Sequence, residues 1–202
     1  LSQSRVLNTF SPDHFAYIIV DEFHHSAAGS YQKVIDHFTP RFFLGMTATP
    51  ERMDGRDVLR FCDYNVAYET RLFDAVEKGW LAPFQYFAIY DPTDYTPIRW
   101  TGTGYDDQEL EHHLSTDTRA RLIINNLKNF LPAFGKTKAL AFCSNIGHAR
   151  YMNEQFKRHD IPSRCLFGTS SIEERAEAMD QLADENHPLQ VICSVDIFSE
   201  GI

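Results

Sequence analysis

The sequence predicts an α/β protein with mostly parallel sheets that are flanked by helices. Two observations support this fold class. Short, continuous apolar runs such as Phe15–Val20 are typical of strands that are buried on both faces, as in parallel sheets. Segments with helix-like spacing of apolar residues separate these runs, and the order strand, helix, strand occurs in both halves of the chain.

Length and composition indicate a globular chain with one large domain or two small ones. Of the 202 residues, 43% are hydrophobic and 23% are charged. The apolar runs are far shorter than the roughly 20 residues that span a bilayer, and no secretion signal begins the chain. We therefore expect a cytoplasmic protein without a membrane partner. The sequence begins with Leu1 rather than Met, which suggests a piece of a longer protein.

The charge balance limits the kinds of partner. Nineteen Lys and Arg residues stand against 28 Asp and Glu residues, which gives a net charge of −9. This balance argues against a broad basic face that binds nucleic acid non-specifically, but it allows a narrow groove with a few contacts. No two of the four cysteines are spaced as in a C-x-x-C metal site, and we expect them to be reduced.

In the first half, the apolar runs Phe15–Val20 and Arg41–Gly45 are expected to be strands. The spacing of Tyr31, Val34, Ile35 and Phe38 predicts a helix over roughly Ala27–Phe38. A short helix over Arg71–Trp80 should end near Gly79, and Phe84–Tyr90 is expected to form a strand.

A loop or inserted connection over Asp91–Tyr105, rich in Pro, Thr, Gly and Asp, roughly divides the chain. The second half then alternates helical stripes with apolar strands. Ser171 and Glu174 fit a capping box at the start of one of these helices. The other predicted elements are helices around Ala120–Phe130 and Ile146–Phe156 and strands at Lys138–Cys143, Ser163–Phe167 and Leu189–Val195.

Four of the apolar strands run directly into polar clusters. In open α/β sheets, ligands bind at the carboxyl ends of the strands, so each cluster should lie at the functional edge of its sheet. The clusters are Asp21–His25, Thr47–Arg52, Ser144-Asn145, and Asp196 with Glu200-Gly201.

Asp21-Glu22 is the pair with the most specific chemistry. A carboxylate directly after a buried strand can bind Mg²⁺, and a second carboxylate can orient or deprotonate an attacking water. The alternative is that the pair only ends a strand. His24 and His25 are alternatively metal ligands, although adjacent histidines rarely face one metal.

The motifs along the chain resemble those of superfamily 2 DEAD/DEAH-type helicases, in the branch that contains type III restriction subunits and related DNA-repair helicases. The resemblance depends on the order and spacing of the motifs over nearly the whole chain. The matching stretches are Asp21–His24 for motif II, Thr47–Pro50 for motif III with its continuation Glu51–Arg56, Ala75–Pro83 for the end of the first RecA-like domain, Ala141–Asn145 for motif IV, Gly168–Arg175 for motif IVa and Ser194–Gly201 for motif V.

The resemblance implies roles for these residues, with ATP and Mg²⁺ as cofactors. Asp21 binds Mg²⁺ and Glu22 is the catalytic base. His24, Thr47 and Thr49 couple the nucleotide state to the second domain. The residues implied near the nucleic acid are Ser144, Arg175 and Ser194, and those implied at the nucleotide are Glu200 and Gly201.

Several of these residues also have a plain structural interpretation. Thr47, Thr49 and Glu200-Gly201 are alternatively turn residues. Ser144 is alternatively the cap of the helix that follows it, and Arg175 is alternatively a solvated helix residue.

Two elements of the family pattern are missing from this sequence. It contains no Walker A motif, because Gly135-Lys136-Thr137 follows a helix and precedes a strand, whereas a P-loop follows a strand and opens a helix. The late arginine motif is also missing. We therefore expect residues 1–83 to be the C-terminal part of one RecA-like domain and residues 84–202 the N-terminal part of another, with an inserted connection near 91–117.

The resemblance implies an ATP-dependent helicase or translocase that acts on nucleic acid, with DNA expected rather than RNA, and that hydrolyses ATP between two RecA-like domains. Its other partners are the remaining parts of the parent chain. This chain alone is expected to be inactive. Two alternatives stay open: an interaction module that binds nucleic acid or protein without hydrolysis, and a metal-dependent nuclease that uses Asp21, Glu22 and the histidines.

Overall fold

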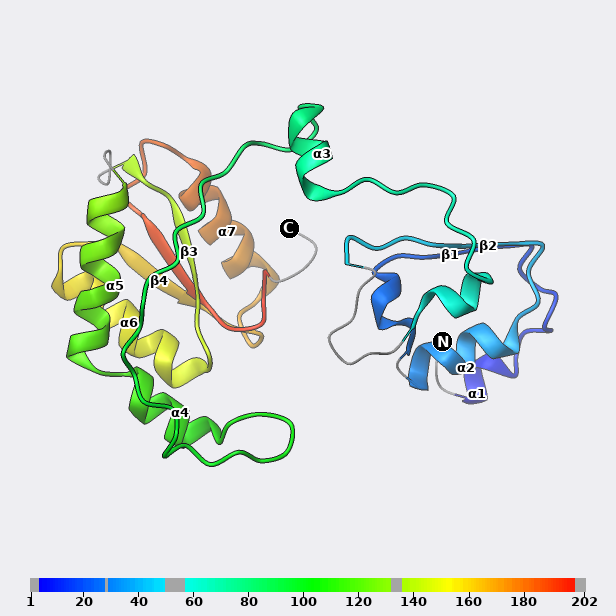
Figure 1. The fold of residues 1–202 in the computed structure, drawn as a ribbon, viewed down its shortest axis with the longest axis horizontal. Coiled ribbons are helices and arrows are strands. Elements are labelled where there is room, and N and C mark those ends of the chain that lie inside the picture. The colour runs from blue at the N-terminus through cyan, green and yellow to red at the C-terminus, as the bar shows by residue number, and fades with distance from the viewer. Residues whose placement is uncertain (1–3, 28, 50–56, 132–135, 199–202) are drawn as a thin grey trace. The chain divides into compact units, whose positions relative to one another are not determined.

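The structure is a computed structural model that describes residues 4–27, 29–49, 57–131 and 136–198. The chain divides into two compact units, Leu1–Gln85 and Tyr86–Ile202 (Figure 1). Each unit contains a parallel sheet with helices beside it, which confirms the predicted α/β fold class.

The first unit is organised around two parallel strands. β1 (Tyr17–Val20) pairs with β2 (Phe42–Gly45), with Tyr17 opposite Phe42 and Val20 opposite Gly45. The helix predicted over roughly Ala27–Phe38 is present as an α-helix, and a 3₁₀ helix that was not predicted precedes it. The helical elements of the unit are α1 (Ser4–Leu7), η1 (Phe23–Ala27), α2 (Gly29–His37), η2 (Leu59–Cys62) and α3 (Leu72–Glu77).

Phe23 and Val58 form the buried core of the first unit, with Val20 and Phe43 packed against them. The backbone of Gly45 approaches the Phe23 ring so closely that an added Cβ would lie 2.4 Å from ring carbons. A side chain at this position would therefore push the ring out of the core.

The prediction that β1 is buried on both faces is wrong. Tyr17 and Ile19 are 71% and 61% exposed, whereas Ile18 and Val20 point to the packed side. Side chains alternate between the two faces of a strand, and described elements of the first unit pack on only one of them.

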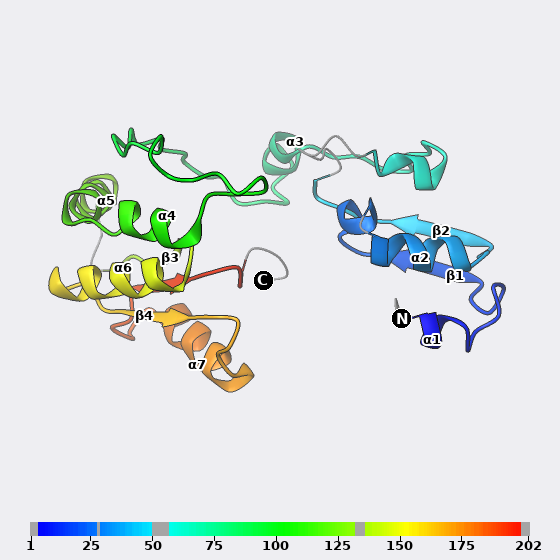
Figure 2. The same cartoon turned by 90° about the horizontal axis from the view of Figure 1, so that it is seen from below.

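The second unit is a three-stranded parallel sheet with helices on both faces. Its strand order is β3 (Ala139–Phe142), β5 (Val191–Ser194) and β4 (Ser163–Leu166). Helices α5 (Asp117–Phe130) and α6 (Ile146–Arg158) cover one face, and α7 (Ile172–Ala183) covers the other (Figure 2). This is a doubly wound arrangement, in which the carboxyl ends of all three strands share one edge.

Two apolar clusters hold these layers together. The larger one joins Ile124 of α5 and Phe156 of α6 to Val191 and Cys193 of β5. The smaller one joins Leu182 of α7 to the other face of the sheet. Most apolar residues of the stripes that predicted α5, α6 and α7 therefore pack in these clusters, whereas Phe130, Ile146 and Ala176 are exposed.

Two expectations near the middle of the chain are wrong. Phe84–Tyr90 is extended but belongs to no strand of the described sheets, and Tyr86 and Tyr90 are 83% and 85% exposed. An isolated extended segment has no ladder of hydrogen bonds, so apolar spacing alone does not make it a strand. The connection near 91–117 contains a helix that was not predicted, α4 (Asp107–Leu114), which Asp106 caps by accepting from two backbone N–H groups.

The residues that were predicted to begin α7 and to end α3 do so in the structure. Ser171 and Glu174 form the predicted capping box at the start of α7. Gly79 adopts the left-handed backbone with φ of 71° that ends α3. Residue Lys136 lies between the end of α5 and the start of β3, which is the reverse of the strand–loop–helix order of a P-loop.

Cys62, Cys143, Cys165 and Cys193 are free thiols in the structure. In the described residues, no helix is long and apolar enough to cross a membrane.

Candidate functional site

The carboxyl ends of β1 and β2 bring the first two polar clusters together. The Met46 backbone N–H donates to the carbonyl of Val20 at 2.9 Å, and the Phe23 N–H donates to the carbonyl of Met46 at 2.8 Å. These bonds extend the parallel pairing past both strand ends. They place the segment that begins with Asp21 beside the segment that begins with Thr47.

His24 lies at the centre of this edge. Its Nδ1 atom is 3.0 Å from the Thr47 hydroxyl and 3.4 Å from a carboxylate oxygen of Glu22. A carboxylate only accepts hydrogen bonds, so the Glu22 contact favours a proton on Nδ1. The Thr49 backbone N–H also donates to the Thr47 hydroxyl, at 3.1 Å. The structure thus joins four of the residues predicted from motifs II and III: Glu22, His24, Thr47 and Thr49.

The backbone at Glu22 is in the left-handed region, with φ of 48°. This conformation costs roughly 1–2 kcal/mol for a residue with a side chain, and such outliers cluster at functional sites. The Glu22 N–H donates to Oδ1 of Asp21 at 2.9 Å. The two carboxylates therefore differ in their contacts: Asp21 accepts from a backbone N–H, whereas Glu22 lies 3.4 Å from Nδ1 of His24.

Asp21 is exposed at the strand end. One of its carboxylate oxygens accepts from the Glu22 N–H, and the other has no partner in the described part of the chain. An exposed carboxylate with a free oxygen fits Mg²⁺, which is usually held by one or two carboxylates together with substrate phosphates.

In the second unit, the carboxyl edge of the sheet carries the other predicted residues. Ser144 follows β3, Ser194 is the last residue of β5, and Arg175 of α7 reaches the end of β4. The Arg175 Nη2 atom donates to the carbonyls of Phe167 and Gly168 at 3.2 and 2.6 Å. The sheet topology therefore gathers Ser144, Arg175 and Ser194 at one edge.

These three residues differ in how exposed they are to solvent. Ser144 is exposed, whereas Ser194 has no exposed surface and its hydroxyl has no hydrogen-bond partner among the described residues. The burial of Ser194 opposes a direct contact with nucleic acid in this conformation. The interpretation of Ser144 as a helix cap is wrong, because the Asn145 side chain caps α6 by accepting from the His148 N–H at 2.9 Å.

Two predicted residues and one motif continuation lie outside the described residues. These are Glu200, Gly201 and the stretch Glu51–Arg56.

Sequence reasoning missed a buried polar network behind Ser144. His148 contacts Ser144, Arg119 contacts His148, and Asp91 pairs with Arg119. The sequence held a weak signal for it, because His148 follows Ser144 by four residues, the spacing of one helical turn. Nothing in the sequence pattern indicated that Arg119 and Asp91 would join them.

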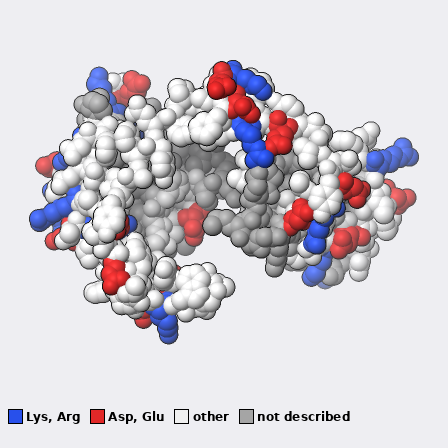
Figure 3. All heavy atoms as spheres, viewed as in Figure 1, with Lys and Arg blue, Asp and Glu red and all other residues white. Residues whose placement is uncertain are grey.

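Charged side chains are mixed over the surface. Lys, Arg, Asp and Glu are interspersed on both units in the view of Figure 3, in keeping with the net charge of −9. In the part of the chain that the structure describes, no group of three or more His, Cys, Asp or Glu residues is placed to hold a metal ion.

Comparisons with known proteins agree with the motifs. Residues 1–52 match the family of the type III restriction enzyme, res subunit. A protein of Schizosaccharomyces pombe that is named as a mitochondrial ATP-dependent helicase, irc3, is 26% identical over 96% of this chain and 32% of its own length. The type I restriction enzyme EcoAI endonuclease subunit of Escherichia coli is 24% identical over 95% of this chain and 26% of its own length.

A solved fragment from Vibrio vulnificus YJ016, named as an HsdR subunit of a type I restriction enzyme, is similar over 96% of this chain with a TM-score of 0.66. It is 24% identical, and this chain covers 36% of it. The likeness shows the fold. This chain spans about a third of the length of irc3 and about a quarter of the EcoAI subunit.

These findings confirm the resemblance to superfamily 2 helicases of the branch that contains type I and type III restriction subunits.

Proposed function

We propose that the intact protein is an ATP-dependent helicase or translocase that acts on nucleic acid, and on DNA rather than RNA. The observation that carries this proposal is the contact of His24 with both Glu22 and Thr47 at the carboxyl ends of β1 and β2. Relatives named as an ATP-dependent helicase and as a restriction endonuclease subunit support it.

Asp21 and Glu22 divide the chemistry between them in this proposal. Asp21 would hold Mg²⁺ through its free carboxylate oxygen. When bound, the ion neutralises charge on the phosphate oxygens of ATP. Glu22 would orient the attacking water and accept its proton, the usual part of a positioned carboxylate.

The contacts of His24 suggest how hydrolysis is linked to the rest of the protein. A change in the charge or position of the Glu22 carboxylate alters the environment of the His24 ring 3.4 Å away. The ring in turn contacts the Thr47 hydroxyl, which also fixes the backbone at Thr49. A local event at Glu22 would thus reach the segment that follows β2.

Other parts of the proposal rest on the resemblance alone. They are the clamping of ATP between two RecA-like domains, the nucleotide contacts of Glu200 and Gly201, and the nucleic-acid contacts of Ser144 and Arg175. The preference for DNA follows the restriction enzymes among the relatives.

Two substitutions in the intact protein test the division of roles. Glu22→Gln keeps the size and polarity of the side chain but removes its ability to take a proton, so DNA-stimulated ATP hydrolysis should fall by about 10² or more. Binding of ATP with Mg²⁺ should survive in this variant. Asp21→Asn should also weaken the Mg²⁺-dependent part of nucleotide binding. Phosphate release and fluorescent nucleotide titration measure the two effects.

ATP hydrolysis, DNA binding and DNA cleavage, measured together, separate the helicase from the two alternatives. Near-normal hydrolysis by Glu22→Gln would contradict the role of Glu22. DNA binding without ATP hydrolysis in the wild-type protein would indicate an interaction module, and DNA cleavage with a divalent metal but no ATP would indicate a nuclease. The 202-residue chain alone should release no phosphate, because its sequence contains no Walker A motif.

A further inference from the structure

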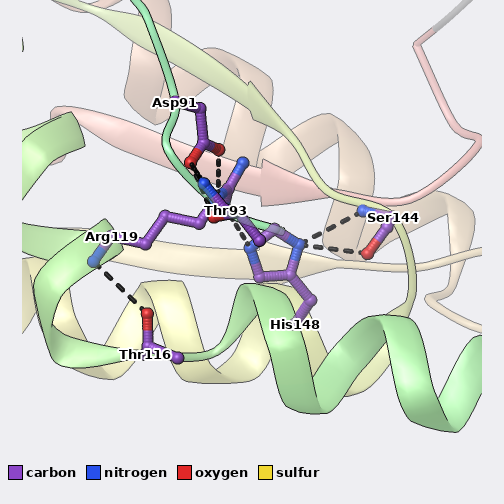
Figure 4. A network of polar contacts seen from close by, with 6 residues as sticks. All are labelled: Asp91, Thr93, Thr116, Arg119, Ser144 and His148. Carbon is purple, nitrogen blue, oxygen red and sulfur yellow. Dashed lines mark hydrogen bonds and ion pairs between the residues drawn. The ribbon is translucent and has the colours of Figure 1, made fainter. Parts of the chain in front are cut away.

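The exposed residue Ser144 is backed by three buried or half-buried polar residues, Asp91, Arg119 and His148, and we call these four residues the His148 network (Figure 4). Its members come from four separate parts of the second unit. Asp91 precedes α4, Arg119 lies in the first turn of α5, His148 lies in the first turn of α6, and Ser144 follows β3.

Asp91 and Arg119 form the fixed end of the network. The Arg119 Nε atom donates to one oxygen of Asp91 at 2.7 Å. The other oxygen of Asp91 accepts from the backbone N–H and the hydroxyl of Thr93, at 3.0 and 2.6 Å. These bonds and the Arg119 ion pair lower the pKa of Asp91, although burial opposes them. The carboxylate therefore stays charged and holds the guanidinium in place.

The guanidinium determines which ring nitrogen of His148 carries the proton. The Nη1 atom of Arg119 lies 3.3 Å from Nε2 of His148. A guanidinium has donors only, so Nε2 must accept and cannot carry a proton. Burial and the positive charge of Arg119 lower the pKa of His148 to about 4, so the ring is neutral at neutral pH. A neutral ring whose Nε2 accepts has its single proton on Nδ1.

The proton on Nδ1 has one acceptor near it. The Ser144 Oγ atom lies 3.2 Å from Nδ1 and accepts this proton. The Ser144 backbone N–H lies 3.4 Å from the same nitrogen and is directed at it, so this N–H faces the buried ring. The hydrogen of the Ser144 hydroxyl is therefore left to donate to a group outside the protein.

We propose that Asp91, Arg119 and His148 are positioning residues that prepare the Ser144 hydroxyl to donate a hydrogen bond to a phosphate oxygen of the bound nucleic-acid strand. This inference rests on the proposed function and adds to it the groups that set the donor. It fits an acidic protein, because a neutral hydroxyl donor binds a phosphate without a broad basic surface.

The protonation state of the His148 ring in the wild-type protein provides the first test. In the intact protein with ¹⁵N-labelled histidine, the nitrogen shifts of His148 should show a protonated Nδ1 and an unprotonated Nε2 at neutral pH. Arg119→Leu removes the donor to Nε2, so the ring should shift toward the form protonated at Nε2. A wild-type ring protonated at Nε2 would overturn the proposal.

Binding to a fluorescent single-stranded oligodeoxynucleotide provides the second test. Ser144→Ala should weaken binding about tenfold, the usual effect of losing one hydrogen bond to a charged group, and Ser144→Thr should restore it. Arg119→Leu should weaken binding to a similar extent. In the Ser144→Ala background it should have little further effect, because both substitutions remove the same donor.

Tyr151→Phe is the matched control. It removes a 2.9 Å hydrogen bond from α6 to Asp117 of α5, outside the His148 network, and should leave binding unchanged. If the wild-type protein binds DNA and Ser144→Ala binds equally well, the proposal fails while the proposed function stands. If the wild-type protein binds no nucleic acid, the proposed function fails and this inference fails with it.

Discussion

His148 is 5% exposed and lies against a guanidinium, so its charged form is disfavoured in the folded protein. In the first unit, Glu22 also depends on its neighbours. Its backbone is left-handed, and its carboxylate contacts His24. In both cases a single side chain is placed by its neighbours rather than by its own conformational preference. Such placement makes the chemistry of each residue sensitive to substitutions one contact away.

The pH dependence of stability should report the burial of His148. The pKa of His148 is about 4 in the folded protein and 6.5 when unperturbed. Between these values the unfolded chain binds the proton more tightly, so the free energy of unfolding should fall as the pH drops through 6.5 toward 4. The loss from this residue should reach about 2 kcal/mol between about pH 7.5 and about pH 5.

Urea denaturation of wild type and His148→Phe at both pH values measures this contribution, because the other titrating groups are common to both proteins. The stability of the wild type should fall more steeply than that of the variant. If the free energy of unfolding changes equally with pH in the two proteins, His148 titrates normally and the ring is not held neutral by Arg119.

At the scale of elements, the sequence predicted helices and strands where a local signal coincides with the packing. Most apolar residues of the α5, α6 and α7 stripes pack in the two core clusters, and the capping residues of α7 are those expected. The strand ends also placed Asp21, Glu22, Thr47 and Ser144 at sheet edges, because parallel strands share their carboxyl edge.

What could not be predicted depends on contacts between distant segments. The extended stretch Phe84–Tyr90 has strand-like composition but no strand partner in the described sheets, and pairing is not a local property. Ser194 differs from Ser144 by complete burial, which the strand pattern does not reveal. The His148 network joins residues up to 57 positions apart, from Asp91 to His148, and no spacing rule connects them.

The capping box of α7 gives a prediction at this scale. The Ser171 hydroxyl accepts from the Glu174 N–H at 3.1 Å, and the Glu174 carboxylate accepts from the Ser171 N–H at 2.8 Å. Ser171→Ala leaves the first N–H groups of α7 without this acceptor and should lower the free energy of unfolding by about 1 kcal/mol. Ser171→Asn, which retains capping, should cost much less. Chemical denaturation compares the three proteins, and equal loss in both variants would contradict a capping role.

At the scale of the whole molecule, the chain consists of two compact units with separate cores. The division between them, Gln85 and Tyr86, falls in a stretch where apolar side chains lack burial. Phe84, Tyr86 and Tyr90 are exposed, and the backbone from Ala82 to Tyr95 forms no regular element. That the units are parts of two RecA-like domains stays a prediction.

Limited proteolysis should therefore cut first between the two units. Chymotrypsin cleaves after aromatic residues, and it requires a backbone that can leave its surroundings locally. Exposed aromatic residues without regular structure are most concentrated at Phe84, Tyr86, Phe87 and Tyr90, although Tyr68 is a further such site, whereas Phe23, Phe38 and Phe156 are buried. Mass spectrometry of early digests should show fragments that end near residues 84–90. The start of the loop Asp91–Tyr105 should resist longer, because the Arg119 side chain of α5 donates to Asp91, and Thr93 and Thr96 donate locally to Asp91 and Asp94. First cleavage within β3 to β5, with residues 84–90 intact, would show that the division into two units does not describe the protein in solution.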